Sequence, residues 1–128
     1  MKNEIVKKPA ALFSLALLLA GCRYDLPAVD AGSVETHSFV GGMDQATMTK
    51  LSPAQIKALA EWFFAHPTGW SYRIADMAPG AFLYLKHAGR NVAGVNLRPE
   101  GIYVASYFRA LTAAEHAQLE SMIATPKN

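Results

Sequence analysis

The chain has 128 residues, with 12 basic side chains, 10 acidic side chains, four histidines and one cysteine. This length is enough for one compact domain with its own apolar core. A single cysteine excludes an intramolecular disulfide and any zinc site that needs two thiolates.

Residues 1–21 have the pattern of an export signal. Three lysines (Lys2, Lys7 and Lys8) form a positive start, and the apolar run AALFSLALLLA follows. About eleven helical residues reach about 16 Å, less than the about 30 Å hydrocarbon core, so we expect a cleaved signal rather than a spanning helix. The signal removes three basic residues and one acidic residue, and nine of each remain. The mature chain is formally neutral, so we expect no nucleic-acid partner.

The signal ends in Leu19-Ala20-Gly21-Cys22, which resembles the bacterial lipobox. The resemblance implies cleavage between Gly21 and Cys22, a thioether-linked diacylglycerol on Cys22, and a further acyl chain, palmitate or similar, on its nitrogen. Several acyl chains hold a protein on a bilayer far better than one. Arg23 replaces the Asp that retains lipoproteins in the inner membrane, which implies an outer-membrane lipoprotein facing the periplasm. A secretory signal that ends in Cys by chance, or an uncleaved anchor, is the alternative.

Residues 22–50 are predicted to form a lipidated, flexible tether before a domain at residues 51–128. The stretch has no sustained helical or strand period, and Pro27, Gly32, Gly41 and Gly42 interrupt it. The segment 34–40 is the exception, because it has the composition of an edge strand.

Two helices are predicted from their capping patterns. Ser52 is a helix N-cap followed by Pro53 and by Gln55 at the third position, and an apolar stripe with helical spacing follows until Pro67. Thr112 and Glu115 repeat the same capping box before a second apolar stripe.

Three short apolar runs lie between these helices, at residues 81–87, 91–97 and 102–108, and turn residues separate them. They predict an antiparallel meander. The expected fold is therefore a two-layer α+β domain of order α-β-β-β-α, with both helices on one face of a three-stranded sheet. A fourth strand from residues 34–40 or 70–76 is left open. Beyond the lipobox, the arrangement resembles small uncharacterised proteobacterial lipoproteins, which implies no activity.

The predicted register places Phe82, Tyr84, Val95 and Phe108 beneath the helices. The opposite face then holds the apolar and aromatic residues Leu83, Leu85, Tyr103 and Tyr107. Either another segment or a second copy covers this face, or it binds a partner. Trp62 and Trp70 flank the end of the first helix, and they are predicted to be core residues or interface anchors.

No pattern of residues predicts chemistry. The sequence contains no Gly-x-Ser-x-Gly motif, no phosphate-binding glycine loop and no histidine pair at metal-ligand spacing. We therefore expect no catalytic residue, no metal and no cofactor apart from the lipid on Cys22. The predicted function is a non-enzymatic, periplasm-facing module that binds an envelope protein, as an assembly accessory or an inhibitor. The alternative is a structural or ligand-binding lipoprotein that contacts peptidoglycan or lipid.

Overall fold

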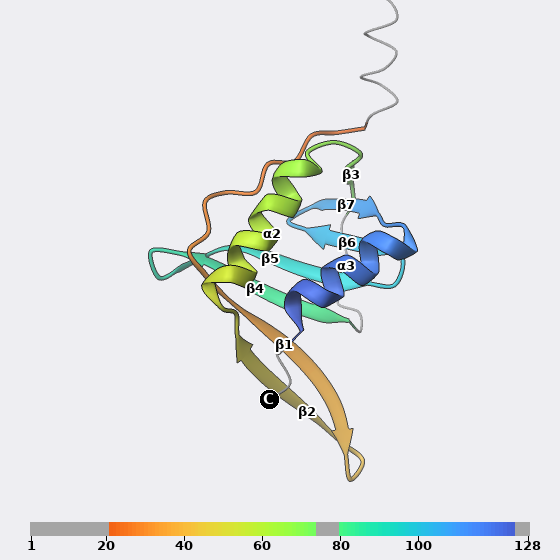
Figure 1. Ribbon diagram of the computed structural model, residues 1–128. Coiled ribbons are helices and arrows are strands. Elements are labelled where there is room, and N and C mark those ends of the chain that lie inside the picture. The colour runs from red at the N-terminus through yellow and green to blue at the C-terminus, as the bar shows by residue number, and fades with distance from the viewer. Residues whose placement is uncertain (1–20, 74–79, 125–128) are drawn as a thin grey trace, which may run out of the picture.

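The computed structural model describes residues 21–73 and 80–124, and within them seven strands form one antiparallel sheet. Across the sheet the order is β2-β1-β4-β5-β6-β7-β3. Figure 1 shows both helices over the same face of this sheet. In chain order the elements are β1 (Ala31–Val40), β2 (Met43–Lys50), α2 (Pro53–Ala65), β3 (Ser71–Tyr72), β4 (Ala81–His87), β5 (Arg90–Arg98), β6 (Gly101–Val104), β7 (Tyr107–Ala110) and α3 (Ala113–Ile123).

The predicted three-stranded meander of order α-β-β-β-α was wrong. Strands β1 and β2 precede the first helix, β3 follows it, and the run predicted as one strand at 102–108 contains two strands. The open question about 34–40 is answered, because this segment lies within β1. In the second open segment, Ser71–Tyr72 form β3, and residues 74–79 lie outside the described residues.

The β1–β2 hairpin occupies most of the segment that was predicted to be a tether. Its two-residue turn is Gly41-Gly42, with φ values of 61° and 79°, and Val40 pairs with Met43 across it. Two positive φ values are what a type I′ hairpin turn requires. The strands lack a period-2 pattern because most of their side chains are exposed on both faces. The alternation that normally identifies a strand is therefore confined to the first five residues of β1 and is absent from the rest of the hairpin.

The side-chain faces predicted for the first hairpin of the meander were wrong. The turn there is the two residues Ala88-Gly89, not three, and a bulge follows Leu85. Leu83 consequently pairs with Val95 and joins it beneath the helices, whereas Phe82 faces the other way. Without the bulge, the two-residue turn would pair Phe82 with Val95, as the predicted faces require. The bulge shifts this pairing by one residue, and a one-residue slip moves every side chain of a strand to the opposite face.

Both predicted capping boxes are confirmed. The Ser52 side chain accepts from the Gln55 amide while the Gln55 side chain accepts from the Ser52 amide, and Thr112 and Glu115 do the same at α3. Gln55 also joins the two helices, since its Nε2 donates to the carbonyl oxygens of Met122 (3.0 Å) and Ala124 (3.1 Å).

The Glu115 carboxylate makes the start of α3 sensitive to pH. The Thr112 amide donates to it at 2.9 Å, and Arg109 Nη1 donates at 3.1 Å. These contacts hold the pKa of Glu115 below its ordinary value of 4.5, the Thr112 amide having the largest effect. His66 Nε2 also faces the carboxylate, at 3.4 Å.

Because the folded-state pKa of Glu115 is lowered, its contribution to the free energy of unfolding is complete above about pH 4.5 and is lost as the pH falls through the folded-state value. We expect Glu115→Gln to be less stable than the wild type at neutral pH, since Gln keeps the acceptor but not the charge. Urea unfolding in acid should show the two proteins converging. A stability difference that stayed constant with pH would contradict this prediction.

The apolar core lies between the sheet and the helices, and the segment before β1 contributes to it. Tyr24, Leu26 and Val29 pack, partly buried, against the core. Figure 1 shows this segment running beside α2 toward β1. The expected flexible tether was therefore wrong, because residues 22–30 lie along the domain and residues 31–50 belong to its sheet. The fully buried side chains include Phe63, Trp70, Leu85, Ile102, Val104 and Leu119.

Candidate functional site

Four of the six predicted partner-binding residues are buried in the core. Leu83, Leu85, Trp62 and Trp70 belong to one cluster between the sheet and the helices, and Trp70 is 0% exposed. They have no free surface to offer a partner. Of the two predictions made for the tryptophans, the core position is the one observed.

The two predicted tyrosines lie on opposite faces of the sheet. Tyr107 pairs with Val104 on the helix-covered face, and Tyr103 pairs with Phe108 on the other face. Tyr103 is buried there, with its ring 4.6 Å from the Phe108 ring and the Arg98 guanidinium 4.3 Å above it. The predicted Leu/Tyr surface is therefore not formed. The missed feature was the Ala105-Ser106 turn, which has no Gly, Pro or Asn to indicate it.

Cys22 is exposed and lies at one edge of the sheet. Its amide donates to the Trp70 carbonyl at 2.7 Å, and the Trp70 amide donates back at 3.2 Å. Trp70 directly precedes β3, which is the edge strand, so Cys22 pairs on the outer side of the sheet. An acylated nitrogen keeps one N–H, so this bridge is compatible with cleavage before Cys22.

An aromatic cluster fixes the chain just after Cys22. The Tyr24 ring lies 5.3 Å from Trp70, 5.4 Å from Tyr107 and 6.2 Å from Phe63. Burial raises the pKa of the Tyr24 hydroxyl. Two exposed aromatic side chains flank this cluster, Phe64 near the end of α2 and Tyr72 in β3. We call Cys22, Tyr24, Phe64 and Tyr72 the anchor edge.

At the opposite edge, the β1–β2 hairpin extends beyond the rest of the sheet. Strand β1 pairs with β4 only over Ala31–Glu35, so residues 36–47 form a two-stranded arm (Figure 1). Apolar side chains are exposed at its tip: Phe39 (79%), Val40 and Met43 (71%). Seven interstrand steps of about 4.8 Å separate β2 from Cys22, which makes about 34 Å along the sheet.

A polar network holds the base of the arm. The Tyr84 hydroxyl donates to Glu35 at 2.6 Å, and the His37 ring lies 3.2 Å from Glu35 and 3.1 Å from Asp44. The hydrogen bond to the Glu35 carboxylate raises the pKa of Tyr84. These residues line or adjoin a shallow polar cleft of about 290 Å³ beside Lys86. The network ties β1, β2 and β4 together where the arm leaves the sheet, and so sets its direction.

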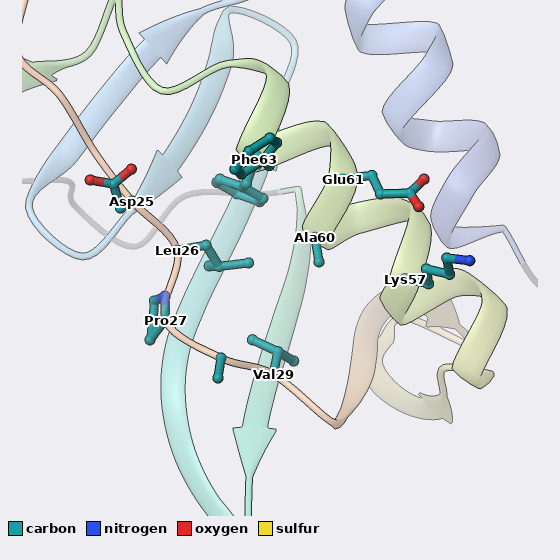
Figure 2. Close-up of a pocket in the computed structure, with 10 residues that line it drawn as sticks. Asp25, Leu26, Pro27, Val29, Lys57, Ala60, Glu61 and Phe63 are labelled. Carbon is teal, nitrogen blue, oxygen red and sulfur yellow. The ribbon is translucent and has the colours of Figure 1, made fainter.

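A larger groove lies between residues 25–29 and α2. It has a volume of about 610 Å³, and its lining includes Leu26, Val29 and Phe63 (Figure 2). Figure 2 shows the Leu26 side chain directed toward α2, and the charged residues Asp25, Lys57 and Glu61 also belong to the lining. The groove is mainly apolar and carries no convergent set of polar groups that would orient a ligand.

The described part of the chain offers little for catalysis or metal binding. Within residues 21–73 and 80–124, no group of three His, Cys, Asp or Glu side chains is arranged to hold a metal ion. Over the same residues, no helix has both the length and the apolar character needed to cross a membrane. The signal predicted for residues 1–21 lies outside the described residues except at Gly21.

Comparison with protein families, with curated proteins and with solved structures returns no match to this chain. The candidate site therefore depends on geometry alone. It has two parts, the anchor edge around Cys22 and the exposed arm at the far side of the sheet. Sequence reasoning singled out Cys22 and left residues 34–40 open as an edge strand, but it missed the hairpin that forms the arm, whose turn is Gly41-Gly42.

Proposed function

We propose that this protein is an outer-membrane lipoprotein, acylated on Cys22, whose domain binds a periplasmic protein through the arm. It acts by holding that partner near the membrane and not by catalysis. The anchor part of the proposal comes from the lipobox residues and from Arg23, and the exposure of Cys22 is compatible with it.

The exposed apolar tip of the arm is the observation that carries the proposed binding function. A two-stranded hairpin is marginally stable alone, and exposed apolar side chains gathered at one place commonly mark interaction surfaces. Phe39 lies on one face of the tip and Val40 and Met43 on the other, so the tip is apolar on both faces. Among the described residues β2 is an edge strand of the sheet, with one side unpaired beside these side chains. Exposed edge strands readily accept a further strand, which adds backbone hydrogen bonds to the apolar contacts.

Site-specific photocrosslinking in cells tests this surface. A photoreactive residue at position 39 or 43 should give a discrete adduct, and one at the exposed Glu61 on α2 should not. The double variant Phe39→Ser/Met43→Ser should weaken binding by about 2 kcal/mol or more, the scale of interface hot spots, while the melting temperature changes little. Equal crosslinking at all three positions, or none at the arm, would contradict the proposal.

The alternative lipoprotein function is contact with peptidoglycan or lipid. The apolar groove between residues 25–29 and α2 is the feature that favours it. Retention of the purified domain on sacculi, unaffected by the arm variant, would support this alternative over protein binding.

A further inference from the structure

We propose that the domain stands directly on the bilayer by its anchor edge, with Phe64 and Tyr72 at the level of the lipid headgroups. This inference rests on the proposed acylation of Cys22. It adds to that proposal an interaction surface, its occupant and the orientation of the arm.

The first argument is that no flexible segment separates the acylated residue, Cys22, from the folded domain. Two hydrogen bonds join Cys22 to Trp70, at 2.7 and 3.2 Å, and Tyr24 packs against Trp70, Tyr107 and Phe63. Acyl chains attached to Cys22 therefore leave from the β3 edge of the sheet itself. A domain held in this way cannot sit a tether's length above the membrane.

The second argument is the chemistry of the surface around Cys22. Phe64 is 87% exposed and Tyr72 is 67% exposed, which is unusual for aromatic residues of a folded domain. Tyrosine is favoured at the membrane interface, because its ring is partly dehydrated there while its hydroxyl stays hydrated. The Phe64 ring has no polar group and gains by entering the boundary between headgroups and acyl chains. Arg73 follows Tyr72 at the same edge, with its guanidinium 4.2 Å from the Phe108 ring on the other face of the sheet, and its exposed positive charge suits anionic headgroups.

The third argument excludes the arm as the membrane-facing end, although its tip is also apolar. The arm lies about 34 Å along the sheet from Cys22, at the opposite edge. The arm carries the Asp44 carboxylate beside His37, and the Glu35 carboxylate lies at its base. When the anchor edge contacts the bilayer, each successive strand from β3 to β2 lies farther from the membrane, so the sheet acts as a rigid spacer. The arm is then presented to the periplasm.

The single cysteine gives this inference a direct test. Once Cys22 is acylated, a cysteine introduced at position 64, 72 or 43 is the one free thiol and can carry a fluorophore. The lipidated variants Phe64→Cys, Tyr72→Cys and Met43→Cys would be placed in vesicles of phosphatidylethanolamine and phosphatidylglycerol that contain nitroxide-labelled lipid. All three positions are exposed, so the Met43 site is a matched control.

We expect lipid nitroxide to quench the labels at positions 64 and 72 several-fold more than the label at position 43. An aqueous quencher should give the reverse order. Equal quenching at all three positions, or stronger lipid quenching at 43, would overturn the inference. Self-quenching at 64 or 72 without any effect of lipid nitroxide would show that a second copy covers this edge, which also overturns it.

Palmitate labelling of the same variants separates the two proposals. If palmitate is incorporated but lipid nitroxide quenches all three labels equally, the docking of the anchor edge is wrong and the lipoprotein proposal is unaffected. If no palmitate is incorporated, the anchor is absent and both proposals fail.

Discussion

Replacing Cys22 with Ser is expected to move the protein from the membrane fraction to the soluble fraction or to leave it unprocessed. The serine hydroxyl is not a substrate for thioether formation, so neither the diacylglycerol nor the later N-acyl chain is added. Each acyl CH₂ contributes about 0.8 kcal/mol to membrane binding, so the loss of the chains is a very large effect. Fractionation and palmitate labelling measure it.

The folded domain provides the control for this variant. Cys22 contacts Trp70 through backbone atoms, and its side chain is exposed, so Cys22→Ser keeps both hydrogen bonds. The melting temperature of the purified domain should therefore be unchanged. Membrane attachment and palmitate incorporation that persist in Cys22→Ser would show that the lipobox interpretation is wrong.

Replacing Trp70 with Ala is expected to destabilise the domain by about 3–5 kcal/mol, the range for large aromatic residues in a core. Trp70 is fully buried, its ring lies 5.8 Å from Phe63, and its Nε1 donates to the His66 carbonyl at 2.8 Å. Truncation leaves a cavity and an unpaired carbonyl. Since small domains are stable by about 5–15 kcal/mol, much of the total would be lost. Urea unfolding gives the free energy directly.

Phe64→Ala is the control, because it also removes an aromatic ring from the same part of the fold. Phe64 is largely exposed, so its replacement should change the free energy of unfolding by about 0.5 kcal/mol or less. The pair separates a core role from a binding role at this end of the molecule. A folded, stable Trp70→Ala protein would contradict the burial of Trp70.

The helices were predictable because their signals are local. Ser52, Pro53 and Gln55 specify where α2 begins through hydrogen bonds within one turn, and Thr112 with Glu115 does the same for α3. No distant contact is needed to form a cap. For the same reason, the resemblance to a lipobox at Cys22 could be proposed from a few consecutive residues.

The strands were predicted less well because their faces depend on turns and partners. The exact length of the Ala88-Gly89 turn and the bulge after Leu85 decide which side chains of β4 meet the helices. The Ala105-Ser106 turn reverses the chain between Val104 and Tyr107 although Ala105 adopts a φ of 53°, a value more usual for glycine. Gly89 indicated the first turn, but composition offered no indication of the bulge or of the Ala105-Ser106 turn.

The candidate site divides in the same way. Local sequence was sufficient to propose an exported chain, to single out Cys22 for acylation and to locate two helices, because each of those inferences concerns neighbouring residues. Three features were visible only in the tertiary structure. Trp62, Trp70, Leu83 and Leu85 are buried in the core, and Cys22 pairs with Trp70, 48 positions away in the chain. The arm extends from the opposite edge of the sheet. Burial and edge position depend on how strands are ordered, and strand order arises from long-range pairing that no single segment encodes.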